Sequence, residues 1–315
     1  MDSVEMDLHL TTTQVAELLD VHPSTVKRWC NDGDLEIDKT GGGHRRIALH
    51  EVLLLAELRE IPTLLDGFAP YQDRVWTAIQ EAVGEQRFDG VRELAMEWLK
   101  TGELWRISRL LLVLGRHPAV EFAAFCDDVV RGFMQSVGAH WSTGELRVGE
   151  EHLASESLAE VLIRLREPFA TAPDASRPLA VVGSMEGVRH GLGSWCVRLL
   201  LERHGWEVCF LGTDVPMEDF AAIQQSREAS LVCISFASPA GAADMVRAMR
   251  ILARFYEADR PFALALGGDL AEAPEFDPAD LPFHDIGIFG SLRDFRDAIA
   301  PEGSMRLPDT MGAVR

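Results

Sequence analysis

Hydrophobic positions repeat with a helical period through the middle of the chain and change to short continuous runs after residue 178. In residues 71–167, apolar side chains recur every three or four residues, as in Ile107, Leu110, Leu111 and Leu114. This pattern predicts four or five amphipathic helices joined by short connections. Such an arrangement is typical of an α-helical bundle.

Five short apolar runs follow, at residues 179–183, 206–212, 230–236, 262–268 and 285–290. Helical patterns at residues 190–204, 217–228 and 241–257 separate the first four runs. Apolar runs that alternate with helices predict a parallel sheet covered on both faces. We therefore expect a doubly wound α/β domain of the Rossmann-like, flavodoxin-like kind, whose ligands bind at the carboxyl ends of the strands.

The N-terminal segment predicts a helix-turn-helix. A threonine-capped helix starts near residue 11, His22 and Pro23 end it, and a second helix begins at once. Its first turns carry four polar or basic side chains that are candidates for contact with DNA, namely Ser24, Thr25, Lys27 and Arg28. We expect an all-α winged module here, with a wing that follows a short strand at residues 35–37.

The candidate wing is a glycine-rich hairpin that ends in three potential phosphate donors. The sequence reads Thr40-Gly41-Gly42-Gly43-His44-Arg45-Arg46. Glycines allow a hairpin tip to approach another backbone closely, and His44, Arg45 and Arg46 supply cationic or polar contacts to phosphate. A small helical cap with a glycine loop is the simpler alternative.

The borders of the predicted domains follow from these patterns. Three prolines among small and polar residues mark residues 168–178 as a linker. We expect a DNA-binding domain at residues 1–70, the helical bundle at residues 71–167, the α/β domain at residues 179–300 and a loose tail at residues 301–315.

Composition restricts how the chain can bind nucleic acid. Thirty basic and 50 acidic residues give a formal net charge of −20, so bulk charge repels DNA and the basic groups must act through their placement. Five scattered cysteines without a paired spacing predict buried thiols in a reducing compartment. The N-terminus has no signal-peptide pattern and no apolar run is long enough for a membrane span, so we expect a cytoplasmic protein.

A third group of candidate residues lies where the predicted strands end. His190 and Gly193 follow the first strand, Ser235 ends the third, and Gly267 and Gly268 end the fourth. An imidazole at the ligand crevice can bind a metal, and glycines at strand ends leave room for a ligand. Taken singly, each residue is more often structural; together they predict a cofactor site.

These segments resemble two known families. The N-terminal segment is similar to the winged helix-turn-helix of MerR-type regulators. The α/β segment resembles the cobalamin-binding domain, with its D/E-x-H-x-x-G motif, a following serine and a glycine pair. This resemblance implies that His190 is the lower axial cobalt ligand and that the nucleotide tail passes Ser235, Gly267 and Gly268. Val188 stands where that family has an acid, and Glu186 is the candidate substitute.

The predicted bundle resembles the helical domain that covers the upper face of the corrin in CarH-like regulators. Trp141, Glu151 and His152 match the W-x9-EH motif of that group. The resemblance implies that the indole shields the upper ligand and that the carboxylate binds an adenosyl hydroxyl. Ser142 stands where members of the group often have a histidine that binds cobalt after illumination.

The whole chain thus resembles CarH-like, adenosylcobalamin-dependent photoreceptors, which are homo-oligomeric (dimer to tetramer) repressors and not enzymes. The resemblance implies assembly on operator DNA in the dark and release when light breaks the Co–C bond. Two alternatives stay open. One is a regulator that uses methylcobalamin or another cobalamin as a plain effector, and the other is a corrinoid methyl-carrier protein.

Overall fold

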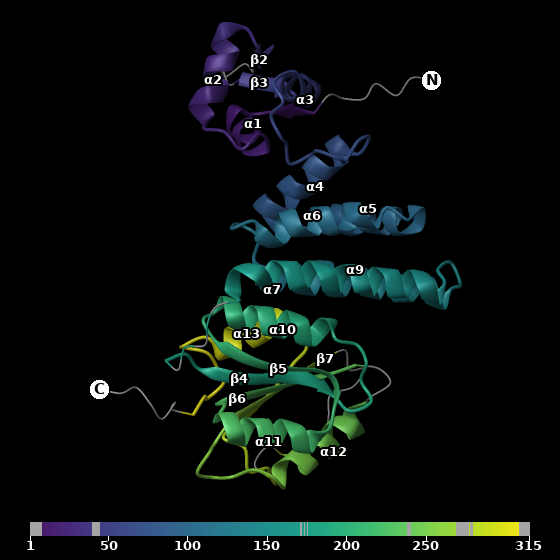
Figure 1. Ribbon diagram of the computed structural model, residues 1–315. Helices are drawn as coiled ribbons and strands as arrows, with labels where there is room; N and C mark the ends of the chain where they lie inside the picture. Colours follow the sequence, from purple (N-terminus) through teal and green to yellow (C-terminus); the bar gives the residue numbers. More distant parts are fainter. Residues whose placement is uncertain are drawn as a thin grey trace. The chain divides into compact units, whose positions relative to one another are not determined.

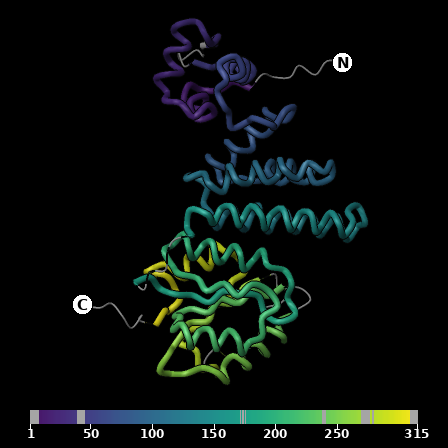
Figure 2. Tube along the Cα trace, in the orientation of Figure 1, coloured from purple at the N-terminus to yellow at the C-terminus, as the bar shows by residue number. Residues whose placement is uncertain are grey.

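A computed structural model describes residues 8–39, 45–170, 172, 174, 176–237, 241–268, 277 and 280–308. The chain divides into two compact units, residues 1–94 and 95–315 (Figure 1). The border lies within helix α5 (Asp89–Thr101), which belongs to the predicted bundle. Figure 2 follows the chain through both units.

The first unit contains the predicted helix-turn-helix. Its elements are β1 (His9–Leu10), α1 (Thr12–Leu18), α2 (Pro23–Asp32), β2 (Asp38–Lys39), β3 (Arg45–Ala48), α3 (Leu49–Leu58) and α4 (Gln72–Glu85). The short strands form an antiparallel sheet in the order β1-β3-β2. A small sheet therefore accompanies the helices of this module, and the strand expected at residues 35–37 begins slightly later, at Asp38.

Local side chains set the ends of α1 and α2. Thr11 caps α1 through a capping box, because its hydroxyl accepts from the Gln14 amide at 3.3 Å and Gln14 Oε1 accepts from the Thr11 amide at 2.9 Å. His22 caps α2 by accepting the Ser24 amide at 3.2 Å, with Pro23 in the first turn. Gly33 ends α2 at φ 82°, a left-handed conformation that glycine adopts without strain.

The second unit begins with helices that pack into a bundle. They are α6 (Leu104–Arg116), α7 (Phe122–Ala124), the π-helix η1 (Phe125–Arg131), α8 (Gly132–Ser142) and α9 (Val148–Arg166). The stripe predicted from the helical period is confirmed, since Ile107, Leu110, Leu111 and Leu114 are buried. The π-helix in the middle of the α7–α8 segment was not predicted, because a one-residue change in turn size leaves little trace in hydrophobic spacing.

The rest of this unit is the predicted doubly wound α/β fold. Its strands are β4 (Leu179–Met185), β5 (Glu207–Val215), β6 (Leu231–Phe236), β7 (Ala263–Gly268) and β8 (Asp285–Phe289). All pairs are parallel, and the order β5-β4-β6-β7-β8 is that of flavodoxin-like sheets. The helices are α10 (Leu192–Arg203), α11 (Met217–Arg227), α12 (Ala242–Ala253) and α13 (Leu292–Ile299).

Helices cover both faces of this sheet. α10 and α13 lie on one face and α11 and α12 on the other (Figure 1). Phe220 of α11 and Met245 of α12 are fully buried in one core with strand residues that include Val232 and Leu264. Burial on both faces explains why the strands read as continuous apolar runs and do not alternate.

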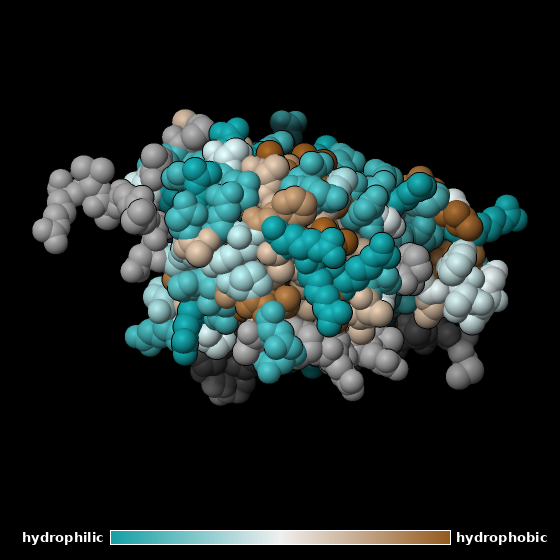
Figure 3. All heavy atoms as spheres, turned by 90° about the horizontal axis from the view of Figure 1, so that it is seen from below, coloured by the Kyte–Doolittle hydropathy of each residue, from teal (hydrophilic) through white to brown (hydrophobic). Residues whose placement is uncertain are grey.

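Hydrophilic residues predominate on the surface that Figure 3 shows, and hydrophobic residues lie among them in small groups. The segment predicted as a loose tail is packed as far as residue 308. Met305 is 8% exposed, its amide donates to the Ala298 carbonyl at 3.0 Å, and the Arg306 amide donates to Asp285 at 2.7 Å.

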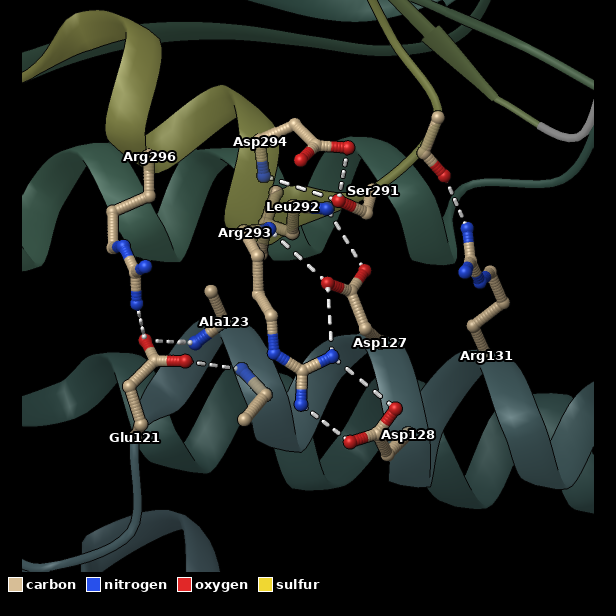
Figure 4. A network of polar contacts seen from close by, with 12 residues as sticks. Glu121, Ala123, Asp127, Asp128, Arg131, Ser291, Leu292, Arg293, Asp294 and Arg296 are labelled. Carbon is tan, nitrogen blue, oxygen red and sulfur yellow. Dashed lines mark hydrogen bonds and ion pairs between the residues drawn. The ribbon is translucent and has the colours of Figure 1, made fainter. Parts of the chain in front are cut away.

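A polar network joins the π-helix to α13 (Figure 4). Asp127 caps α13, because its carboxylate accepts from the amides of Leu292 at 2.8 Å and Arg293 at 3.1 Å. The Arg293 guanidinium binds both oxygens of Asp128, at 3.2 and 2.5 Å. Asp127 and Asp128 are consecutive in the π-helix, and both engage the first turn of one helix.

Two further contacts extend this network. Arg296 of α13 pairs with Glu121 at 2.9 Å, and Glu121 caps α7 by accepting the amides of Ala123 and Ala124. The Arg131 guanidinium donates to the carbonyl of Gly290, directly before α13. The α7–η1 segment is therefore tied to the α/β fold by capping as well as by charge.

The structure also bears on the sequence predictions about cysteines and membrane-spanning segments. All five cysteines are free thiols; four are buried and Cys209 is half-buried. Within the described ranges, no helix has the length and hydropathy that crossing a lipid bilayer requires.

Candidate functional site

The second helix of the helix-turn-helix exposes the face that was predicted to contact DNA. Ser24, Lys27 and Arg28 are exposed, and Thr25 is half-buried. The opposite face packs into the core through Val26, Trp29 and Cys30. Because Ser24, Lys27, Arg28 and Asn31 are spaced by three or four residues, they line one side of α2. Ser24 also contributes to the cap, with its hydroxyl 2.7 Å from His22 Nδ1.

The wing strand contributes two arginines that the structure places differently. Arg45 is bonded to α2, donating to the Lys27 carbonyl at 3.2 Å and to Asn31 Oδ1 at 2.7 Å. It therefore fixes the wing strand against the helix. Arg46 is half-buried on the same strand. His44 and the glycines of the predicted wing tip, together with Thr40, lie outside the described residues.

The second site lies in the α/β fold, at the carboxyl ends of its central strands. Ser184 of β4 is paired with Ser235 of β6, and Ser235 is paired with Gly267 of β7. The strand order reverses between β4 and β6, which makes this edge a topological switch point, where ligands of such folds bind. Of the predicted residues, the sheet brings Ser235, Gly267 and Gly268 together here.

His190 lies in the loop between β4 and α10, beside this edge. Its side chain is exposed, and the backbone around it is fixed by two buried serines. The Ser184 hydroxyl donates to the His190 carbonyl at 3.3 Å and lies 3.2 Å from the Ser194 hydroxyl, which donates to the Gly191 carbonyl at 2.9 Å. The imidazole is thus held on an ordered loop and points to no partner among the described side chains.

At two glycines of the predicted site, Gly193 and Gly268, a neighbouring part of the chain lies too close for a larger side chain. A Cβ at Gly193 would lie 3.0 Å from Ser235 Oγ, so the first turn of α10 closely approaches the end of β6. Gly268 has φ 149°, and a Cβ there would lie 1.8 Å from the Phe236 carbonyl oxygen. The sequence analysis assigned Gly268 to leaving room for a ligand; its immediate role in the structure is to let β7 pass the backbone of β6.

The carboxylate that reaches the His190 loop is Asp214, which sequence reasoning missed. Asp214 Oδ1 accepts the Gly187 amide at 2.7 Å, and the Asp214 amide donates to the Val188 carbonyl at 3.0 Å. Val188 is 1% exposed, so the position that holds an acid in the resembled motif holds a core side chain here. Glu186, the expected substitute, is exposed and makes no ion pair in the described part of the chain.

The bundle residues predicted to cover the upper ligand lie at the α8–α9 turn. Trp141, near the end of α8, is 51% exposed. Glu151 and His152 are in the first turn of α9 and pair with each other at 3.0 Å. Val148 and Leu153 add exposed apolar surface nearby in sequence. Ser142 donates to the Ala139 carbonyl at 2.7 Å and so ends α8.

Helix α9 extends toward the edge of the sheet that carries His190. α9 packs beside α10, and Arg166 at the end of α9 pairs with Glu202 at the end of α10 at 2.9 Å. At 1.5 Å per residue, Glu151 lies about 22 Å from that pair along α9, and the start of α10 lies about 15 Å from it. The first turn of α9 therefore projects beyond α10, on the side of the β4–α10 loop (Figure 1).

The residues present fit a cobalamin. His190 offers one exposed imidazole on a loop held by Ser184 and Ser194, and imidazole is a common metal ligand. In the bundle, Trp141 near the end of α8 is exposed, and Glu151 lies in the first turn of α9, the helix that projects beyond α10.

Three families match the chain in the order that the fold displays. Residues 10–57 match the family described as helix-turn-helix domain. Residues 75–166 and residues 178–300 match two families, each described as B12 binding domain, the first helical and the second α/β. The chain thus carries a helix-turn-helix domain and two B12 binding domains, in the order that the sequence predicted.

Two proteins are related to this chain in sequence. The HTH-type transcriptional repressor CarH of Myxococcus xanthus is 26% identical over 220 residues, which cover 65% of this chain and 71% of that protein. Dimethylamine corrinoid protein 3 of Methanosarcina acetivorans is 26% identical over 102 residues, 32% of this chain. The chain spans about half (48%) of that corrinoid protein. The predicted likeness to CarH-like regulators is confirmed.

Among solved structures, the monomethylamine corrinoid protein of Methanosarcina barkeri covers 64% of this chain and 92% of its own, at 17% identity and a TM-score of 0.44. The fold assignment made above rests on the strand order and register of this chain.

Proposed function

We propose that the protein is a light-responsive transcriptional repressor that binds adenosylcobalamin, assembles in the dark and then binds operator DNA. The observation that carries this proposal is the combination of a DNA-reading helix and two B12 binding domains in one chain, with Trp141 exposed on the overhanging bundle. A large exposed indole is costly in water, and a ligand that covers it favours the covered state.

The exposed imidazole of His190 would bind cobalt through a ring nitrogen. The hydrogen bonds from Ser184 and Ser194 fix the backbone of its loop. A preordered loop loses less conformational freedom when the ligand binds, so binding is tighter. Ser235, Gly193 and Gly267 would line the path of the nucleotide tail, and Gly268 allows β7 to pair with β6 beside it.

Above the corrin, Trp141 and Glu151 contact the adenosyl group, and His152 orients Glu151 through their ion pair. Bound adenosylcobalamin supplies a cobalt–carbon bond that light breaks. A ligand shifts a conformational equilibrium only by its differential affinity for the two states. Trp141 must therefore contact the adenosyl group in the assembled state and lose that contact on illumination.

Size-exclusion chromatography tests this proposal directly. Protein loaded with adenosylcobalamin in the dark should elute as a larger oligomer than apo-protein or illuminated protein. The Trp141→Ala variant should retain the cofactor and elute as apo-protein does. Equal elution volumes for the parent in all three states would exclude light-gated assembly.

One observation favours a second candidate, a cobalamin regulator without a light switch. Ser142 occupies the position where a histidine would bind cobalt after illumination, and its hydroxyl is already bonded to Ala139. A plain effector role predicts that methylcobalamin and adenosylcobalamin promote DNA binding equally and that light changes neither. The corrinoid methyl-carrier alternative is supported by the partial likeness to the dimethylamine corrinoid protein, but methyl transfer has no use for a DNA-reading helix.

A further inference from the structure

The loop that carries His190 is held from the neighbouring strand by a single acidic residue. Asp214 lies at the carboxyl end of β5, one residue before Val215, which pairs with Met185 at the end of β4. Its carboxylate accepts the Gly187 amide at 2.7 Å, and its own amide donates to the Val188 carbonyl at 3.0 Å. Both bonds engage the chain within three residues of His190.

The backbone at this point is arranged to make that contact. The β4–β5 register shifts twice, between Val182 and Gly183 and between Gly183 and Met185. Such irregularities bend a strand and redirect its side chains. Asp214 itself has φ 58°, a left-handed conformation that aspartate and asparagine tolerate better than most residues. The strand end thus turns its carboxylate toward the β4–α10 loop.

The other contacts of the loop explain why Asp214 matters. Val188 is buried and donates its amide to the Met185 carbonyl at 3.0 Å, while Ser184 holds the His190 carbonyl. These bonds come from β4 itself. Asp214 is the one side chain from another strand that bonds the 186–190 segment in the described part of the chain. Without it, Gly187, at φ 83°, has no side-chain restraint.

We propose that Asp214 is a positioning residue that fixes the β4–α10 loop and so presents the His190 imidazole to cobalt. This inference rests on the proposed role of His190 as the axial ligand. Val188, at the position where the resembled motif has an acid, is buried and cannot orient His190. Asp214 on the adjacent strand β5 takes that part by holding the backbone of the His190 loop. Residues that orient a metal ligand typically change metal affinity by 10–100-fold when they are lost.

Two substitutions separate the carboxylate contact from backbone strain. Asp214→Asn keeps a side-chain oxygen that can accept the Gly187 amide and tolerates a positive φ. Asp214→Gly can adopt the left-handed backbone conformation of this position, but it removes the carboxylate that accepts the Gly187 amide. The matched control is Asp259→Gly, which removes an exposed aspartate from the connection before β7, at the opposite edge of the sheet.

The first measurement uses apo-protein. Amide hydrogen exchange of residues 186–191 should accelerate at least about tenfold in Asp214→Gly and stay near the parent rate in Asp214→Asn and Asp259→Gly. Unchanged exchange in Asp214→Gly, with circular dichroism showing a folded protein, would overturn the proposal.

The second measurement uses protein labelled with ¹⁵N-histidine and loaded with cob(II)alamin. Electron paramagnetic resonance then shows whether a histidine nitrogen splits the cobalt signal. The splitting should be clear in the parent and in Asp214→Asn, and lost or mixed in Asp214→Gly, with cobalamin affinity reduced about tenfold. Full splitting in Asp214→Gly would overturn the positioning role. A parent whose splitting is insensitive to the label, and to His190→Ala, would instead overturn the ligand assignment of the proposed function.

Discussion

Single atoms decide several contacts around the proposed cobalamin site. At Gly268 the missing Cβ allows β7 to pair with β6, and at Gly193 it allows α10 to start beside Ser235. Serine hydroxyls hold the backbone of the His190 loop and leave the imidazole free of protein hydrogen bonds within the described residues. Small residues thus allow close packing of these elements and order the loop that carries His190.

We expect Gly268→Ala to lower the free energy of unfolding by about 3 kcal/mol or more, because the new methyl group overlaps the Phe236 carbonyl and the backbone is strained. Denaturant unfolding of the apo-protein measures this. Gly138→Ala is the control: its Cβ meets nothing within 4 Å inside α8, so it should stabilise by about 0.5–1 kcal/mol. Equal stability of both variants would contradict the steric role of Gly268.

The thiols give a prediction about pH. Burial raises the pKa of the Cys233 thiol, and burial followed by the hydrogen bond with Cys196 raises that of Cys126. Fewer thiolates exist at pH 8, so iodoacetamide should label half-buried Cys209 faster than Cys126 or Cys233. Peptide mass spectrometry of folded protein, against urea-unfolded protein as control, measures the order.

The same raised pKa values predict how stability changes with pH. The folded thiols hold their protons above the unfolded pKa of about 8.5, so their contribution to stability is complete below that value and is lost progressively as pH rises from there toward the raised folded pKa. The midpoint of urea unfolding should therefore fall between pH 8 and pH 10. Cys233→Ser should reduce this dependence, and an unchanged slope would show that Cys233 does not contribute to it.

At the scale of elements, the π-helix is one connection between the bundle and the α/β fold, beside the packing of α9 on α10. Its wide turn places Asp127 and Asp128 against the first turn of α13, while Arg131 donates to the Gly290 carbonyl, two residues before that helix (Figure 4). In a regular α-helix, consecutive side chains are separated by a larger angle about the helix axis than in a π-helix. The contacts of Asp127 with the amides of α13 and of Asp128 with Arg293 therefore depend on the π geometry.

Asp127→Ala should therefore destabilise the protein by about 1–3 kcal/mol, since it removes a buried acceptor of the Leu292 and Arg293 amides, while the N-cap Ser291 still accepts the Asp294 amide. Asp128→Ala is the matched control. Its carboxylate is 37% exposed, so the loss should be about 0.2–1 kcal/mol. Thermal or urea unfolding compares the two. A larger effect at Asp128 would show that charge pairing, and not capping, holds this junction.

The recognition helix and the wing strand allow a test of DNA contact. Arg28→Ala should weaken operator binding by about 1–3 kcal/mol if it makes a bidentate base contact. Arg46→Ala should lower the salt slope of log K by about 0.9 for one lost phosphate contact. Fluorescence anisotropy at several salt concentrations measures both, with Arg247→Ala on α12 as the control. If both variants bind the operator as tightly as the parent protein does, this face of the helix-turn-helix does not contact DNA.

At the scale of the whole molecule, a net charge of −20 opposes binding to DNA. One helix-turn-helix with few free basic groups binds weakly, and linking several modules raises the apparent affinity without new contacts. The proposed function therefore predicts that a cofactor far in sequence from the DNA-reading helix controls binding through assembly.

We expect operator affinity of the adenosylcobalamin-bound protein to fall by about 10²–10⁴-fold on illumination, in parallel with loss of the oligomer. Anisotropy titrations in the dark and after green light measure the ratio. Protein loaded with methylcobalamin serves as the control for the upper ligand. A constant affinity across these states would favour the plain effector role.

The sequence determined the order of the domains, the class of each fold and the cofactor class. Periodicity fixes helices and buried strands because burial repeats with the geometry of the element. The convergence of Ser235 and the glycine pair was predictable because parallel strands end at one edge, so residues far apart in sequence meet there.

Only the tertiary structure decided the contacts between elements. Asp214 has no local signature, since its importance arises from a strand end that bends toward a loop 24 or more residues earlier in the chain. The capping of α13 by Asp127 depends on a π-turn, and Gly268 is required by the backbone of another strand. Arg45 supports the recognition helix for the same reason. Hydrogen-bond partners and steric limits across elements are set by packing, which hydrophobic periodicity along one segment does not encode.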